Sequence, residues 1–494
     1  MQERLKILLV SSEVDPFAKT GGLADVAGSL PKALARLGHD IRIIMPRYKQ
    51  IKNTEYLNDM PVEMDGHLET AIVRQAMLPV KGGEADLKIP VYFIDNYKFF
   101  YREGLYGHID DGARFNFFTK AVLSALPKLD FKPDVIHCND WQTAMLPLFL
   151  KVKYEDEPFY KNTATVFTIH NLQYQGRFPK DVLITLNLPE KKFFTPDQLE
   201  YWGQVNYMKA GILYSDLINT VSDKYSLEIQ TSEFGEGLDG LLRKRAQDLY
   251  GILNGIDYNN FNPETDERIY KNFSLATIKD KKENKYALQE ELGLPKKDVP
   301  MISLISRLAS QKGLDLLANV INDLLETNVQ FVLLGSGEDR YQHFFSELKI
   351  RYRNKAAIHI GFDSDLAQRI YAASDIFLMP SRFEPCGLGQ MISMRYGTIP
   401  VVHATGGLED TVIDYHQDNE RGNGFSFTHY SAVELWKTIQ RAVGLYTDYP
   451  DQWRQLVTNA MRADFSWKKS AEKYVSYYRR ALTKRRENTL ERTG

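Results

Sequence analysis

The chain has 494 residues, 43% of them apolar, and its 62 lysines and arginines nearly balance 64 acids for a formal net charge of −2. This length predicts two large domains or three small ones, and the balanced charge argues against nucleic acid or an anionic membrane surface as the main partner. With two cysteines, Cys138 and Cys386, and no signal-peptide-like or membrane-spanning run, we expect a cytoplasmic protein without structural disulfides or a zinc site.

Short apolar runs separated by helical patterns fill the first half of the chain. Runs without polar alternation are typical of strands buried on both faces of a parallel sheet. After the first run, apolar residues follow three-and-four spacing from Leu23 to Leu37 and stop before Gly38, which suits a helix C-cap. The predicted strands are 7–10, 41–45, 91–94, 135–136, 165–169 and 217–221.

A turn-rich segment, 251–263, interrupts this pattern and marks a domain boundary. A second series of predicted strands follows at 302–305, 329–334, 358–360, 376–379 and 401–402. We interpret the lysine-rich segment 281–285 ahead of that series as a solvated helical face. At the carboxyl end, Ser466 can cap a helix with one apolar stripe, which includes Trp467, Tyr474 and Tyr478.

The predicted fold class is therefore α/β, with two doubly wound domains and a terminal helix. The domains are residues 1–252 and 253–465, and the terminal helix is 466–494. Two such domains leave a cleft between the carboxyl edges of their sheets, where open α/β sheets bind their ligands.

One loop suits an anionic ligand. Lys19, Gly21 and Gly22 follow the first predicted strand and precede its helix. A glycine pair lets backbone approach a ligand closely, a helix start presents free N–H groups, and Lys19 adds a full charge. A tight turn with an ordinary surface lysine would explain this loop equally well if it stood alone.

Further polar clusters follow other predicted strands, so all of them are expected at one edge of their sheets. Singly, each has a simpler explanation: His170 could be a core histidine, Arg307 and Lys312 could be surface cations, and Glu384 could simply pair with Arg382. Their common placement at strand ends favours a site. The clusters are His137, Asn139, Asp140 and Trp141; His170 and Asn171; Ser306, Arg307 and Lys312; and the segments 335–338, 380–387 and 403–407.

Three cations and two glycine pairs, 21–22 and 406–407, suit a diphosphate, so we expect a nucleoside diphosphate as leaving group. Lysine and arginine can neutralise the developing charge without a metal or other cofactor. The P-loop run and the kinase H-R-D and D-F-G motifs are absent. Glycoside hydrolysis by Glu384 and Asp140 stays formally open, although a hydrolase would not need the cations.

The motifs together resemble those of bacterial glycogen synthases, which are close to plastid starch synthases. The resemblance spans residues 1 to about 480. It implies a GT-B fold, with a terminal helix returning to the N-terminal domain, and retaining transfer of glucose from ADP-glucose to the non-reducing 4-OH of an α-1,4-glucan. The motifs that carry it are Lys19-Thr20-Gly21-Gly22-Leu23, Ile169-His170-Asn171, Asn254-Gly255-Ile256-Asp257, Ser306-Arg307 with Gln311-Lys312-Gly313, and Pro380-Ser381-Arg382-Phe383-Glu384-Pro385-Cys386-Gly387-Leu388.

Roles follow from the resemblance residue by residue. The catalytic set it implies is Lys19, Asp140, His170, Arg307, Lys312 and Glu384. His170 would contact the sugar near the reacting carbon, and Glu384 would orient it through its hydroxyls. The remaining donor contacts implied are Gly21, Gly22, Asn171, Asn254, Phe362, Cys386, Gly387, Leu388, Thr405, Gly406 and Gly407, with Glu13, Tyr174 and Gln175 on the acceptor side and no metal.

The sequence departs from the wider superfamily at two positions. Ile392 stands where a second glutamate is common, so Glu384 alone must act in that loop. Phe362 stands where some relatives have tyrosine, and its ring would stack on adenine. We expect domain closure and a same-face, ion-pair-like substitution. Alternatives are a UDP-glucose-dependent GT-B transferase, a catalytically silent glucan-binding protein and, with a cofactor lysine, a phosphorylase.

Overall fold

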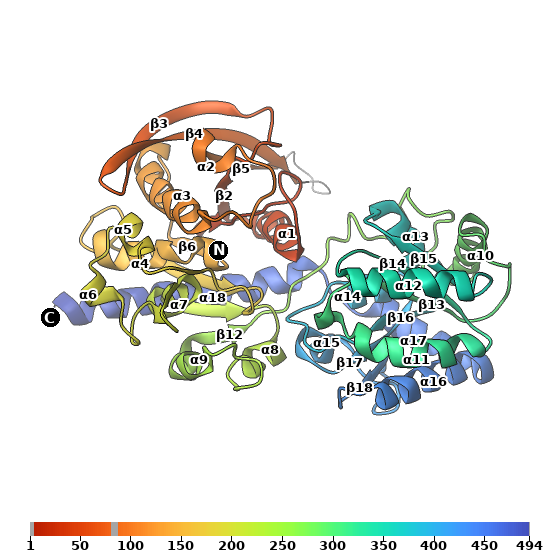
Figure 1. Ribbon diagram of the computed structural model, residues 1–494. Helices are drawn as coiled ribbons and strands as arrows, with labels where there is room; N and C mark the ends of the chain where they lie inside the picture. Colours follow the sequence, from red (N-terminus) through yellow and green to blue (C-terminus); the bar gives the residue numbers. More distant parts are fainter. Residues whose placement is uncertain (1–3, 81–86, 494) are drawn as a thin grey trace. The chain divides into compact units, whose positions relative to one another are not determined.

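The computed structural model describes residues 4–80 and 87–493. The chain forms two compact units (Figure 1). We call residues 1–255 with 467–494 the N-terminal unit, and residues 256–466 the C-terminal unit. Each unit contains its own open α/β sheet, as expected for the α/β class.

The N-terminal unit contains, within its described residues, a nine-stranded sheet. All its neighbouring strands pair in parallel except at the edge formed by the last two. Each strand predicted in this half coincides with an observed one. From one edge to the other the strands are β12 (Leu249–Gly251), β11 (Leu217–Thr220), β7 (Ala164–Ile169), β6 (Val135–Asn139), β1 (Lys6–Val10), β2 (Asp40–Pro46), β5 (Lys88–Asp95), β4 (His67–Pro79) and β3 (Glu55–Met64).

The antiparallel hairpin β3–β4 was not among the predicted strands. Asp65 and Gly66 form its turn with φ of 50° and 73°, the left-handed conformation that short hairpin turns require. Figure 1 shows the two strands as long curved arrows at the edge of the unit. They lengthen the sheet beyond the parallel core without contributing to the predicted site loops.

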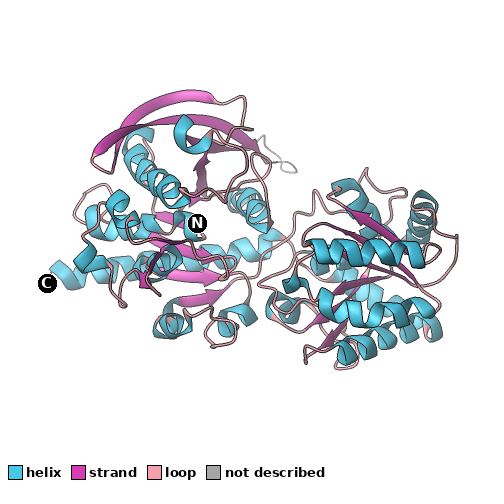
Figure 2. Ribbon diagram, in the orientation of Figure 1, coloured by secondary structure: helices cyan, strands magenta, loops and turns pink. Residues whose placement is uncertain are grey.

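Helices cover both sides of this sheet (Figure 2). Helix α1 begins after Gly21 and is followed by Gly38 with φ of 89°, in agreement with the predicted C-cap glycine. The helices are α1 (Gly22–Arg36), α2 (Tyr97–Phe100), α3 (Asp111–Ala125), α4 (Met145–Lys153), α5 (Val182–Leu186), α6 (Glu190–Phe193), α7 (Tyr207–Tyr214), α8 (Asp223–Glu228), α9 (Asp239–Lys244) and α18 (Trp467–Thr493). A small sheet joins β8 (Arg177–Phe178), β10 (Gln204–Asn206) and β9 (Glu200–Tyr201).

The terminal helix α18 is part of the core of the N-terminal unit, although it follows the C-terminal unit in sequence. Its stripe of Trp467, Tyr474 and Tyr478 is buried. Polar bonds fix its register: Tyr478 Oη lies 2.9 Å from His137 Nδ1 on β6, and Asn219 Nδ2 on β11 donates to Tyr474 Oη at 3.1 Å. Burial and these bonds together hold the chain end against the sheet.

The C-terminal unit contains, in its described part, a six-stranded sheet whose neighbouring strands all pair in parallel. The predicted strands again coincide with observed ones, and β18 is additional. Its strands in order are β15 (Ala356–Ile360), β14 (Gln330–Gly335), β13 (Met301–Ile305), β16 (Ile376–Met379), β17 (Ile399–His403) and β18 (Phe425–Phe427). Its helices are α10 (Lys281–Glu291), α11 (Leu314–Glu326), α12 (Asp339–Arg351), α13 (Ser364–Ala373), α14 (Gly389–Arg395), α15 (Gly406–Thr411), α16 (Ala432–Asp448) and α17 (Pro450–Arg462).

The interpretation of segment 281–285 as a solvated face was wrong. Asn284 and Lys285 are buried, and Lys285 Nζ lies 2.6 Å from Asp375 Oδ2. Lys281 Nζ donates to the carbonyl oxygens of Tyr371 and Ala372 at the end of α13. These lysines cap a neighbouring helix end and pair with a buried acid, which composition alone does not reveal.

Candidate functional site

In each unit, the predicted site loops follow strands that are neighbours in the sheet. In the N-terminal unit, the loop with Lys19, the residue Asp140 and the residue His170 follow β1, β6 and β7. In the C-terminal unit, the segments containing Lys312, Glu384 and the glycine pair 406–407 follow β13, β16 and β17. Because parallel strands end at the same edge, each unit gathers its polar loops there, as the sequence predicted.

Glu13 holds the glycine loop of the N-terminal unit. Its carboxylate accepts hydrogen bonds from the Thr20 backbone N–H, from Thr20 Oγ1 at 2.6 Å and from the Gly21 N–H at 3.3 Å. Tyr106 Oη donates to Glu13 Oε1 at 2.7 Å. The side chain is buried, so these bonds satisfy it and fix the loop in place. The contact with Tyr106, which comes from a distant segment, could not be predicted from the sequence.

Lys19 makes an ion pair within the fold, whereas the space around Gly21 is open. Lys19 Nζ lies 2.5 Å from Asp25 Oδ1 in the first turn of α1, while 44% of the lysine side chain is exposed. Gly21 is extended, with φ of −158°, and a Cβ added there would meet nothing within 4 Å. The fold therefore does not need a glycine at position 21, which leaves its surface open to a ligand.

Asp140 and His170 are in contact. Asp140, whose φ is 55°, accepts the His170 backbone N–H on Oδ1 at 2.8 Å. Burial raises the pKa of Asp140 to about 7, and bonds from the His170 and Asn171 N–H groups partly oppose that shift. The left-handed backbone of a non-glycine residue is a local strain, and such strain often lies at functional sites.

The His170 ring is held in one tautomer. Asn139 Nδ2 donates to the Val10 carbonyl at 3.0 Å, so Asn139 Oδ1 must accept from His170 Nε2, 2.9 Å away. This leaves Nδ1 without a proton, and burial lowers the pKa of His170 to about 3. His170 is thus a neutral imidazole at physiological pH. Asn139 was noted as a strand-end residue in the sequence, but not as the group that orients this ring.

The other predicted residues of the N-terminal unit lie on the segment that follows His170 and after β12. Tyr174 is 49% exposed, whereas Gln175 is buried and accepts Asn206 Nδ2 at 2.7 Å. Asn171 Oδ1 accepts the Gln173 N–H at 3.0 Å. Asn254 is buried after β12, and within the described part of the chain its Oδ1 has no hydrogen-bond partner.

In the C-terminal unit, the central contact joins Lys312 and Glu384. Lys312 Nζ donates to Glu384 Oε2 at 2.7 Å, and Ser381 Oγ donates to the same oxygen at 3.0 Å. Only 17% of the lysine side chain and 9% of the glutamate side chain are exposed. Oε1 of Glu384 remains available to accept hydroxyl groups. The alternative pairing of Glu384 with Arg382 is excluded, because Arg382 lies 3.7 Å from Asp315 and over the ring of Tyr430.

The glycine pair 406–407 packs against the Glu384 loop through its backbone. A Cβ at Gly406 would lie 2.0 Å from the Glu384 carbonyl oxygen, and one at Gly407 would lie 2.0 Å from the Cys386 carbonyl oxygen. Gly406 also has φ of 45°, and the Gly407 N–H donates to the Glu384 carbonyl at 3.1 Å. Unlike Gly21, these glycines are required by packing. The predicted neighbours Cys386 and Thr405 are buried here, and Gly387 and Leu388 are half-buried.

Arg307 and Phe362 are exposed. The Arg307 guanidinium forms no ion pair with any described residue. Phe362 follows β15 and is 89% exposed, an unusual environment for a large apolar ring. The structure thus brings Lys312, Glu384 and the 405–407 turn into contact, while Arg307 and Phe362 make no such contact.

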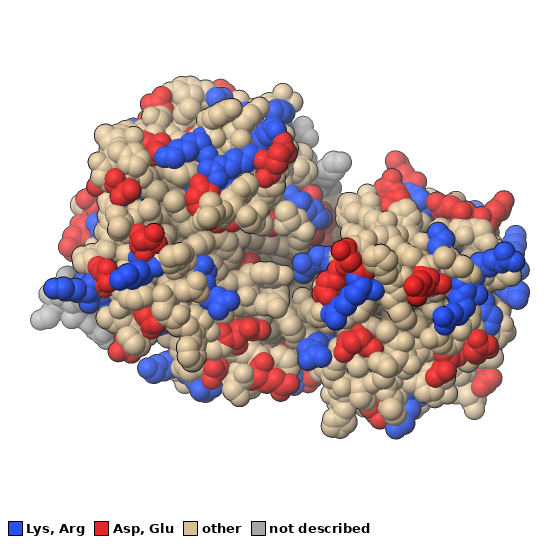
Figure 3. All heavy atoms as spheres, viewed as in Figure 1, with Lys and Arg blue, Asp and Glu red and all other residues tan. Residues whose placement is uncertain are grey.

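On the face shown in Figure 3, positive and negative side chains are interspersed on each unit. Among the described residues, no group of three or more His, Cys, Asp or Glu is arranged to hold a metal ion. No helix in the described ranges is long and apolar enough to cross a membrane.

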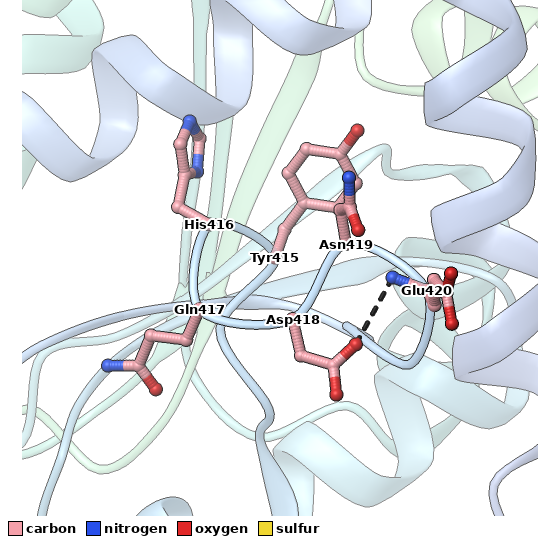
Figure 4. A pocket seen from close by; sticks show the side chains of 6 residues that line it. All are labelled: Tyr415, His416, Gln417, Asp418, Asn419 and Glu420. Carbon is pink, nitrogen blue, oxygen red and sulfur yellow. Dashed lines mark hydrogen bonds between the residues drawn. The ribbon is translucent and has the colours of Figure 1, made fainter.

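One pocket of the C-terminal unit carries none of the predicted residues. It has a volume of about 440 Å³ and is lined by the consecutive residues 415–420 (Figure 4). Asp418 accepts the backbone N–H groups of Glu420 and Arg421, so its carboxylate stabilises the turn itself. We therefore regard this pocket as a feature of one loop.

Known proteins match nearly the whole chain. The model of the starch synthase catalytic domain matches residues 6–244, and that of glycosyl transferases group 1 matches residues 287–457. A glycogen synthase from Moorella thermoacetica is 64% identical, covering 98% of this chain and 99% of its own. One from Desulforudis audaxviator is 54% identical over 97% of each chain. The solved catalytic domain of starch synthase IV from Arabidopsis thaliana, bound to ADP and acarbose, has a TM-score of 0.89 at 36% identity, covering 97% of this chain and 100% of that one.

Proposed function

Because the chain belongs to the family of bacterial glycogen synthases and starch synthases, glycosyltransferases of the GT-B fold, we propose that it transfers glucose from ADP-glucose to the non-reducing 4-OH of an α-1,4-glucan and releases ADP. The observation that carries this proposal is the contact between Lys312 and Glu384. A cation beside a carboxylate with a free oxygen offers one group for a diphosphate and one for sugar hydroxyls. A nucleotide sugar needs both.

The donor phosphates are the proposed ligands of Arg307, Lys312 and Lys19. Arg307 is free to form a bidentate fork with phosphate oxygens, while the two lysines act as point charges. Both lysines have carboxylate partners without substrate, Asp25 and Glu384, so they share their donors with the diphosphate when it binds. The exposed ring of Phe362 offers a stacking surface for adenine.

The proposed chemistry is a same-face substitution. The bond from glucose C1 to the β-phosphate oxygen breaks, and its electron pair goes to ADP, where the cations stabilise it. The acceptor 4-OH then bonds to C1 on the same face and gives its proton to the departing phosphate oxygen. Ile392 stands where a second glutamate would be expected and is buried, which leaves no carboxylate at that position to form a covalent intermediate.

His170 is proposed to stabilise the cationic sugar rather than to accept a proton. Its neutral form and its unprotonated Nδ1 suit contact with an electron-poor ring. A pKa of about 3 makes it a weak base, so a role as general base is unfavourable at physiological pH. Asp140 holds the His170 backbone and is proposed to position it.

Lys19 and Arg307 come from different units, and we propose that both act on the same donor. For this proposal we keep the domain limits predicted from the sequence, which are 1–252, 253–465 and 466–494.

We also propose that the protein acts in the cytoplasm. Neither Cys138 nor Cys386 forms a disulfide, and both are buried, which suits a reducing compartment.

The direct test is donor-specific incorporation. The purified protein is incubated with glycogen and either ADP-glucose or UDP-glucose, and released nucleotide, chain extension and the anomer formed are measured. The proposal expects ADP-glucose to be the preferred donor and the new linkage to be α. Faster transfer from UDP-glucose would identify the alternative donor, and glycogen binding without nucleotide release would identify a silent binding protein.

A further inference from the structure

A second polar pocket lies in the N-terminal unit, on the loop that continues from His170. Its volume is about 330 Å³, at the lower end of the range for small-ligand sites. Three segments form its walls: residues 173–177, Tyr201 at the end of β9, and residues 232–237.

The walls of this pocket are fixed by hydrogen bonds. Tyr201 Oη donates to the Glu236 carbonyl at 2.7 Å, and Gln175 Nε2 donates to the same oxygen at 3.0 Å. The backbone N–H of Met208 in α7 donates to the Gln175 carbonyl at 2.9 Å. The three segments therefore form one rigid unit, and the pocket does not depend on a loose loop.

Apart from Tyr201 and Gln175, the polar side chains of the pocket are unused among the described residues. Within the described part of the chain, the side chains of Gln173, Arg177, Ser232, Glu233 and Glu236 make no hydrogen bond or ion pair. The carboxylates of Glu233 and Glu236 outnumber the guanidinium of Arg177, so binding of an anionic phosphate or nucleotide is disfavoured. Amide, hydroxyl and carboxylate groups together can donate to and accept from the hydroxyls of a neutral polyol.

An exposed indole follows the pocket residue Tyr201 in the chain. Trp202, at the turn between β9 and β10, is 84% exposed and has φ of 51°. Its ring lies perpendicular to that of Tyr201, with centroids 6.4 Å apart. An isolated hairpin turn gains nothing from exposing an indole, whereas the flat face of a sugar ring would cover it.

We propose that the pocket and Trp202 bind the acceptor glucan at residues beyond the one that reacts. This inference rests on the proposed function, because the glucan is the acceptor of that reaction. The loop 170–177 joins His170 to the pocket, so a long acceptor whose end reacts near His170 has a second contact here. A short acceptor does not reach it.

The test compares Trp202→Ala with the wild-type protein, using maltoheptaose and maltose as acceptors at saturating ADP-glucose. We expect Trp202→Ala to raise the KM for maltoheptaose about five-fold or more, as loss of a stacked ring does, with kcat, the KM for maltose and the KM for ADP-glucose unchanged. Trp202→Phe restores most of the affinity. Tyr97→Ala is the matched control, because Tyr97 is also exposed, at 77%, in the same unit.

Glycogen retardation in native gels, without donor, provides a second readout that does not depend on catalysis. Trp202→Ala and Glu233→Gln should each migrate further than the wild type. If both variants are retarded like the wild type and keep its KM for maltoheptaose, the pocket is not a glucan site. If the wild type is retarded in a Trp202-dependent way but releases no ADP, the pocket assignment holds and the proposed transfer fails.

Discussion

Lys312 Nζ donates to Glu384 Oε2 at 2.7 Å, and both side chains are largely buried. The two residues follow different strands, β13 and β16, which are neighbours in the sheet. The pair and the Ser381 hydroxyl orient the carboxylate without substrate, and Oε1 is left open for the proposed sugar hydroxyl. Removing either partner leaves a buried charge without its counter-charge.

Lys312→Met should lower kcat/KM for ADP-glucose about 10²- to 10³-fold, since it removes a group that we propose stabilises the departing phosphate. It should also lower the Tm. Ser381→Ala removes only one hydrogen bond to Glu384 Oε2 and should lower kcat/KM less than ten-fold. Lys437→Met is the control, because Lys437 pairs with Glu434 on an exposed helix surface. Unchanged kinetics for Lys312→Met would remove Lys312 from the mechanism.

Gly21→Ala should separate folding from ligand binding. A Cβ there meets no atom within 4 Å and φ is −158°, so unfolding free energy should fall by no more than about 1 kcal/mol, the scale of replacing a helix N-cap glycine. The KM for ADP-glucose should nevertheless rise, because the methyl group occupies the approach of the ligand. Thermal unfolding and steady-state kinetics on the same samples measure the two effects. A variant with normal KM would show that no ligand passes close to Gly21.

Gly406→Ala should behave in the opposite way. Its Cβ would lie 2.0 Å from the Glu384 carbonyl oxygen at φ of 45°, so the variant should be clearly destabilised, by at least the roughly 1 to 2 kcal/mol of a left-handed alanine. Gly444→Ala in α16 is the matched control: no atom lies within 4 Å of its Cβ, and it should be stabilised by about 0.5 to 1 kcal/mol. Equal Tm values for the two variants would contradict this account of position 406.

Much of the fold was predictable because it depends on local patterns. Buried parallel strands are continuous apolar runs, so β1, β2 and β16 were visible in the sequence, as was the α1 stripe that ends before Gly38. The β3–β4 hairpin was missed although its Asp65-Gly66 turn is a recognised signal. Its strands lie at the sheet edge, where apolar runs are interrupted by polar residues.

The loops that carry the site could be predicted from the sequence, but the contacts between their side chains could not. Strand-end position indicated Lys312 and Glu384 separately, whereas their contact depends on the strand order of the sheet. The role of Tyr106 in holding Glu13 could not be read from sequence, because the residues are 93 positions apart. The buried lysines of α10 were misinterpreted for the same reason.

Asp140 should make stability depend on pH. Its pKa is raised by burial from 3.8 to about 7, so the folded protein binds this proton more tightly than the unfolded chain. Its favourable contribution is complete below about pH 4 and is lost as the pH rises through about 7. The Tm of the wild type relative to Asp140→Asn should therefore fall across that window, by the equivalent of at most about 1.4 kcal/mol per pH unit. A pH-independent difference would show that Asp140 is ionised throughout.

Glu13 should act through the Lys19 loop. Glu13→Gln replaces an acceptor by a donor opposite the Thr20 and Gly21 N–H groups and should lower kcat/KM, with a smaller effect for Tyr106→Phe. The double variant with Glu13→Gln and Lys19→Ala should lose less kcat/KM than the product of the two single losses. Strictly multiplicative losses would indicate that Glu13 acts on substrate independently of the loop.

The central claim is that Lys19 and Arg307 act on the same diphosphate. The most direct measurement is a double-mutant cycle on glucose transfer from ADP-glucose to glycogen, with Lys19→Ala, Arg307→Ala and the double variant. We predict a loss of about 10²-fold or more for each single variant and a double variant that loses clearly less than their product, since both stabilise one developing charge. Near-normal turnover of either single variant, or fully multiplicative losses, would contradict the account.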